Sequence, residues 1–110
     1  MLTFGRILGI VAAAAHVAFW ASFAFINPLP GSTRGTTLIG ATMMTAGAMA
    51  ALAAWKAVHL AMYLLFFVMF VPLGLYLAVT AGAFSIIGWI HVAYLASAVL
   101  VHRGILTAKL

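Results

Sequence analysis

The feature that most constrains this chain is an apolar tract over residues 35–102 that contains one charged residue, Lys56. Lys56 divides the tract into two halves, and each half is long enough to cross a bilayer, which takes about 20 apolar residues. A further apolar run lies at residues 4–26. Because 68% of the 110 residues are hydrophobic, the chain has no room for a soluble domain beside these segments. The sequence therefore predicts one integral membrane domain over residues 1–110.

Turn-forming residues and Lys56 divide the apolar sequence into four predicted helices. The first break is the segment NPLPG at residues 27–31, the second is Lys56, and the third is TAG at residues 80–82. We place the membrane spans at about residues 4–26, 37–55, 57–79 and 84–102. Short links favour antiparallel packing of consecutive helices. The predicted fold is all-α, an antiparallel four-helix transmembrane bundle.

The basic residues are distributed unevenly over this topology. An even number of spans places both termini on one side of the membrane, together with most of the positive charge: Arg6, Lys56, Arg103 and Lys109. Only Arg34 falls on the other side. Because loops that carry more Lys and Arg stay in the cytoplasm, we expect both termini to be cytoplasmic in a bacterial inner membrane.

Several kinds of chemistry are excluded by residue types that the chain lacks. It has no Asp, Glu or Cys, so it cannot form disulfides, thiolate or carboxylate metal sites, or a hydrolytic triad oriented by an acid. Its five Lys and Arg residues are scattered singly at span ends, which is not the pattern of a nucleic-acid-binding surface. We therefore predict no catalytic residues, no metal site and no nucleic-acid partner.

Small residues at helical spacing predict close packing of the first two spans. Gly5, Gly9, Ala12 and His16 share one face of the first span. In the second span, a comparable face carries Gly40, Gly47, Ala51 and Ala54. Such faces allow helix backbones to approach closely. On the second span, Thr42 and Thr45 are expected to bond the carbonyls one turn earlier.

The four histidines are the candidates for a binding site. At about 1.5 Å of rise per residue, His16 lies about 15 Å and His91 about 16 Å from the cytoplasmic ends of their helices, near the bilayer midplane. His59 and His102 lie near the cytoplasmic interface. Two imidazoles at equal depth on facing helices can hold a haem b iron, so His16 and His91 are candidate axial ligands. The alternative is that each histidine forms a helix-to-helix hydrogen bond without any cofactor.

The third span is bulky and aromatic, which is typical of a surface that contacts lipid or another protein. We expect one stripe of this span to face a partner: Met62, Phe66, Phe70 and Leu77. An acid-free chain would not repel the acidic surface of a partner. We therefore expect association with other membrane subunits, or with further copies of the chain, besides the lipid bilayer.

Three functions remain open on this reading. The first is a non-catalytic accessory or interaction subunit of a larger inner-membrane complex, for which electron-transfer complexes are one candidate. The second is a haem-binding membrane cytochrome that uses His16 and His91. The third is a small homo-oligomeric transporter, since the chain is similar in length and span number to the small multidrug resistance transporters. Those transporters rely on a Glu in the first span, and the matching segment here, AAAAHVAFW, has none.

Overall fold

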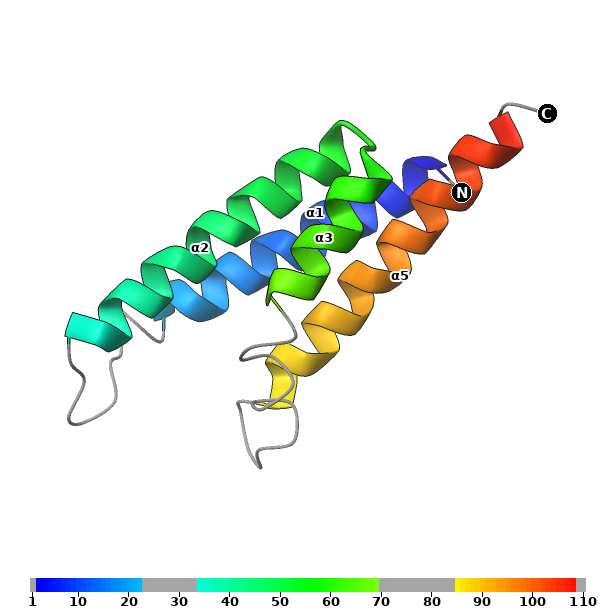
Figure 1. Ribbon diagram of the computed structural model, residues 1–110. Coiled ribbons are helices and arrows are strands. Elements are labelled where there is room, and N and C mark those ends of the chain that lie inside the picture. Colours follow the sequence, from blue (N-terminus) through cyan, green and yellow to red (C-terminus); the bar gives the residue numbers. More distant parts are fainter. Residues whose placement is uncertain (1, 23–33, 70–84, 109–110) are drawn as a thin grey trace.

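A computed structural model describes residues 2–22, 34–69 and 85–108, and all of this part of the chain is helical or in a tight turn (Figure 1). It contains four helices: α1 (Leu2–Ala21), α2 (Arg34–Trp55), α3 (His59–Met69) and α5 (Ser85–Ala108). No strand occurs within these ranges. The all-α prediction is confirmed. The predicted breaks at residues 27–31 and 80–82, and the predicted third span beyond Met69, lie outside the described residues.

Three of these helices are long and apolar enough to cross a membrane: Leu2–Ala21, Thr37–Trp55 and Ser85–Ala108. The helix α5 continues past the predicted end of the fourth span at His102. Its 24 residues correspond to about 36 Å, which exceeds the roughly 30 Å of a bilayer's hydrocarbon core. The continuation is consistent with the sequence, because no proline follows His102 and one helical glycine is tolerated.

The helix α1 packs against both α2 and α5, while α3 packs against the same two helices from another side (Figure 1). The predicted face of α1 is confirmed, since Gly5, Gly9, Ala12 and His16 are all buried. A Cβ added at Gly9 would lie 2.8 Å from Cβ of Ala54 and 2.9 Å from Oγ of Ser97. The absence of a side chain at Gly9 therefore allows α1 to approach α2 and α5 together.

The buried face of α2 follows the helical repeat through Gly40, Met43, Gly47 and Ala50. Away from this face, Thr42 and Thr45 donate to the carbonyls of Leu38 and Ala41 at 2.8 and 2.9 Å, as predicted. Large apolar side chains are exposed on the outer surfaces of all four helices. An apolar exterior of this kind is typical of helices whose solvent is lipid.

A compact turn connects α2 to α3. The N–H groups of Val58 and Ala57 donate to the carbonyls of Ala53 and Ala54 at 3.0 and 3.1 Å, which are the two bonds of a Schellman motif. Ala57 has a φ of 56°, the left-handed conformation that usually selects glycine at this position. The turn reverses the chain within three residues and fixes where Lys56 leaves the end of α2.

Candidate functional site

His16 and His91 lie together in the interior, where α1, α2 and α5 meet. His16 is 1% exposed and His91 is 0% exposed. Nε2 of His16 lies 2.9 Å from the carbonyl O of Met43, and its Nδ1 lies 2.9 Å from Nε2 of His91. A carbonyl only accepts, so Nε2 of His16 carries a proton and donates to Met43. In the neutral ring Nδ1 of His16 is then an acceptor, and Nε2 of His91 donates to it.

Gly47 makes the contact between His16 and Met43 possible. It lies one helical turn after Met43, beside the carbonyl that accepts the bond. A Cβ built on Gly47 would lie 2.8 Å from Cδ2 of His16 and 2.6 Å from Cγ2 of Val17. Both distances are too short for carbon atoms in contact. A side chain at this position would push α1 away and separate the imidazole from the carbonyl.

Two further residues of α5 extend this polar layer. The hydroxyl of Tyr94 donates to the carbonyl of Ala50 at 2.9 Å, and Ser97 donates to the carbonyl of Tyr94 at 2.6 Å. Both side chains are buried. Tyr94 and Ser97 were not selected from the sequence, although they follow His91 at intervals of three residues. That spacing, on a helix with few polar residues, was the available signal.

The predicted pairing of His16 with His91 occurs, but its geometry does not fit a haem iron. A metal–imidazole bond is about 2 Å long, so axial ligation on opposite sides of an iron separates the two nitrogens by about 4 Å. The observed separation is 2.9 Å, and the ring centroids are 5.0 Å apart with planes inclined by 41°. The contact of Gly9 with Ser97 also brings α1 and α5 too close for a porphyrin. The arrangement instead matches the alternative reading, a hydrogen bond between helices.

His59 and His102 form a second pair, which joins α3 to α5. Their rings stack with centroids 4.4 Å apart and an interplanar angle of 5°. Nδ1 of His102 also lies 3.3 Å from the hydroxyl of Tyr63. Stacked rings direct their nitrogen lone pairs outward from their own edges, not toward a shared point. In the described part of the chain, no three His residues gather as metal ligands.

The exposed face of α3 is not the stripe that was predicted to face a partner. Met62 is 0% exposed and its Cε lies 3.2 Å from the Cβ position at Gly9, so this prediction was wrong for Met62. Phe66 is half-buried, and Phe70 and Leu77 lie outside the described residues. The outward face of α3 is formed by Leu60, Leu64 and Phe67, which are 72%, 64% and 61% exposed. Apolar residues occupy every side of α3, so hydrophobic periodicity could not determine which side of the helix faces inward.

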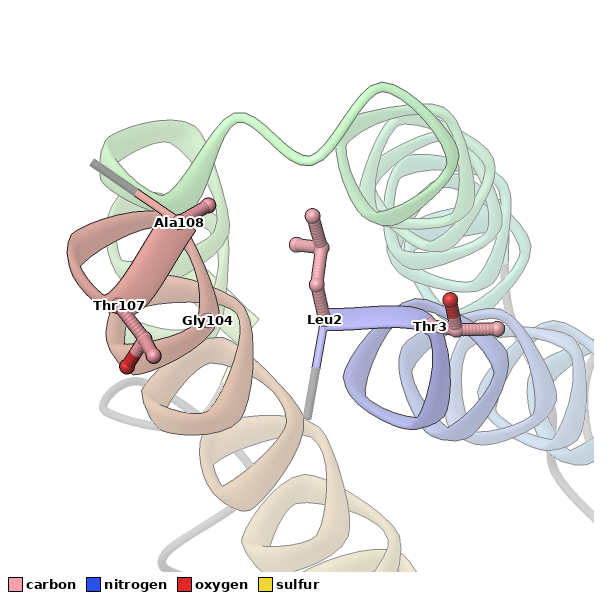
Figure 2. A pocket seen from close by; sticks show the side chains of 5 residues that line it. All are labelled: Leu2, Thr3, Gly104, Thr107 and Ala108. Atoms are coloured by element: carbon pink, nitrogen blue, oxygen red, sulfur yellow. The ribbon is translucent and has the colours of Figure 1, made fainter. Parts of the chain in front are cut away.

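An open depression of about 340 Å³ lies where α1 begins and α5 ends (Figure 2). Its lining residues are Leu2, Thr3, Gly104, Thr107 and Ala108. Figure 2 shows the Thr3 and Thr107 side chains pointing in different directions. The Thr107 hydroxyl already donates to the carbonyl of Arg103 at 2.8 Å. The polar groups of this depression therefore do not converge on a ligand.

Comparison of the chain with protein-family models, with curated proteins and with solved structures finds no match in any of the three.

Proposed function

We propose that the chain is an integral protein of a bacterial inner membrane, an antiparallel four-helix bundle with both termini in the cytoplasm. The order of contacts supports the helix directions. Along α1, Gly5, Gly9 and His16 meet Val101, Ser97 and His91 of α5 in turn. Rising residue numbers on one helix thus pair with falling numbers on the other. The charge distribution supports the orientation.

The proposed role is that of a non-catalytic accessory or interaction subunit of a larger membrane complex. One observation carries this proposal: in the buried polar layer, His16 bonds to His91 and to the carbonyl of Met43, and Tyr94 bonds to the carbonyl of Ala50. The bonds of His16, Tyr94 and Ser97 join helices or stay within one helix. In a membrane interior such bonds contribute to helix association. They use both ring nitrogens of His16 and the hydroxyls of Tyr94 and Ser97, which an enzyme or a proton-coupled transporter would direct at a substrate.

The outward face of α3, formed by Leu60, Leu64 and Phe67, is the proposed contact with another subunit. These large apolar side chains project from α3, on which Leu64 follows the aromatic Tyr63. Knobs of this size fit grooves on a neighbouring transmembrane helix. His59 of α3 stacks on His102 of α5. It therefore points toward α5 and is not part of the outward face of α3.

The test is co-purification in a mild detergent, followed by native mass measurement and identification of every retained protein. We expect a different membrane protein at a fixed ratio to the chain. Leu64→Ala with Phe67→Ala should release it. The matched control is Phe4→Ala with Ile7→Ala, which removes side chains of comparable size and exposure from α1.

Two outcomes would contradict the proposed role. A monomer that retains no protein after gentle extraction would exclude a stable accessory subunit. A dimer of the chain alone, disrupted by the α3 substitutions, would favour the transporter reading instead. Loss of a partner with the α1 control as well as with the α3 variant would place the interface elsewhere.

A further inference from the structure

An apolar groove of about 240 Å³ runs between α2 and α3, close to the turn that joins them. Its lining residues are Met49, Leu52, Ala53, Lys56, Val58, Ala61 and Leu65. Ala53 and Ala61 are the smallest of these residues, and larger side chains on both helices form its walls. The groove is open at Ala53 and Ala61, because a methyl side chain fills less space than its larger neighbours in the lining.

Lys56 is the only charged residue in the lining of the groove. It is exposed and lies at the C-terminal end of α2, where the Schellman turn holds its backbone. The neighbouring cation Arg6 lies over the ring of Trp55, 5.4 Å from its centroid. The chain has no Asp or Glu, so no acidic side chain of its own can neutralise Lys56. The groove therefore has an apolar lining and one cationic side chain, Lys56, at its end.

Trp55 gives the depth of this end in a bilayer. It is 62% exposed and adjoins Lys56. Exposed tryptophans concentrate at the level of the lipid headgroups, because the indole has an apolar body and a polar N–H. Lys56 then lies at phosphate level, and the apolar part of the groove, between Met49 and Leu65, lies at the level of the acyl chains. These are the relative positions of the two parts of a phospholipid.

We propose that this groove binds one anionic phospholipid, with an acyl chain along the α2–α3 groove and the phosphate on Lys56. The proposal rests on the membrane-spanning orientation given under Proposed function, but not on the accessory role. A zwitterionic lipid presents its own cation beside the phosphate and gains less from Lys56. The charge complementarity thus selects an anionic headgroup such as phosphatidylglycerol.

The test uses the full chain in detergent, titrated with dioleoylphosphatidylglycerol or dioleoylphosphatidylcholine and followed by native mass spectrometry. The unmodified chain should retain one phosphatidylglycerol in preference to phosphatidylcholine. Lys56→Gln should weaken phosphatidylglycerol binding about fivefold, since anionic lipid attracts one Lys by about 1 kcal/mol. It should weaken phosphatidylcholine binding by a smaller factor and thereby reduce the preference.

A second variant tests the apolar half of the site. Ala61→Leu places a larger side chain in the groove and should weaken the binding of both lipids equally. Ala48→Leu makes the same change at an exposed position of α2 that does not line the groove. It should bind both lipids as the unmodified chain does. Circular dichroism and gel filtration of each variant verify that the helical fold is retained.

Arg103→Gln is the control for charge, because Arg103 is exposed on α5 and lies outside the groove. An equal loss of phosphatidylglycerol binding in Arg103→Gln and Lys56→Gln would overturn the proposal in favour of unspecific attraction to a basic surface. Unchanged binding in Ala61→Leu would overturn the acyl-chain site. Release of the chain from membranes by alkaline carbonate would instead refute the integral membrane assignment, which this separate measurement detects.

Discussion

The imidazole of His91 donates a hydrogen bond from Nε2 to Nδ1 of His16 across 2.9 Å, and His16 donates from its own Nε2 to the carbonyl of Met43. Three helices are therefore joined at one level by two consecutive hydrogen bonds. Both rings are enclosed by the surrounding helices. We expect His16 and His91 to act as a clamp, that is, to hold α1, α2 and α5 together. The coupling energy between the two histidines can be measured directly.

A double-mutant cycle of His16→Leu and His91→Leu should show a favourable coupling between about 0.6 kcal/mol, the average for hydrogen bonds between membrane helices, and about 1.7 kcal/mol, their maximum. His16→Leu should destabilise the fold more, because it also removes the donor to Met43. Reversible unfolding in mixed detergent micelles measures both effects. His59→Leu is the control, because His59 belongs to the other histidine pair. Its effect on the free energy of unfolding should add to that of His16→Leu without coupling. Additive effects of His16→Leu and His91→Leu would contradict the clamp.

Gly9→Ala should destabilise the fold by about 1–3 kcal/mol, the usual cost of overpacking. The new methyl group would lie 2.8 Å from Cβ of Ala54, and that atom has no rotamer through which it could move away. The same unfolding measurement detects the loss. Ala48→Leu, on the exposed side of α2, should change stability by less than about 0.5 kcal/mol. An unchanged midpoint for Gly9→Ala would show that α1 and α2 are not packed this closely.

Ala57→Gly should stabilise the fold by about 1 kcal/mol, because glycine adopts a positive φ without the clash between Cβ and the carbonyl oxygen. The φ of 56° at Ala57 is the basis of this expectation. At Ala48, in the middle of α2, the same substitution should destabilise by up to about 1 kcal/mol. Opposite signs for the two Ala→Gly changes would verify the turn. Equal losses would mean that Ala57 is helical.

Purified chain from haem-replete cells should show no reducible absorption band in the visible region. The direct bond between His16 and His91 leaves no position for an iron between their nitrogens. His16→Ala should consequently leave the spectrum unchanged. A band that shifts on reduction and disappears in both His16→Ala and His91→Ala would restore the cytochrome reading and require α1 and α5 to move apart.

Reporter fusions after Leu110 should be active only with a reporter that functions in the cytoplasm, because the basic residues concentrate at that end of the predicted topology. Substituting Arg103 and Lys109 by Gln while adding one Lys beside Arg34 leaves two basic residues on each side and removes that asymmetry. It should produce a mixed orientation. Activity of an external reporter on the unmodified chain would invert the assignment of both termini.

Much of the helical pattern could be predicted from the sequence, because apolar segments of this length are divided by charges and turn residues. The depth of the histidines also predicted their pairing, since rise per residue is constant along a helix. Depth contains no information about the distance between helices. That distance depends on contacts such as Gly9 with Ser97, which require the three-dimensional arrangement. For this reason a haem site and a direct bond could not be distinguished beforehand.

The rotation of α3 could not be predicted for a related reason. Met62 and Leu64 are similarly hydrophobic, yet the first is fully buried and the second is 64% exposed. When every side of a helix is apolar, hydrophobicity gives no preferred inner face. Side-chain shape determines which residue faces inward, because the flexible Met62 side chain reaches the space left by Gly9.

The turn at residues 56–58 has a consequence for the order in which the fold forms. With only three residues between Trp55 and His59, the turn holds the start of α3 beside the end of α2. The Schellman bonds form from adjacent residues and need no other part of the chain. We infer that α2 and the first turn of α3 form one helical hairpin from local contacts alone, before the other described helices pack against it.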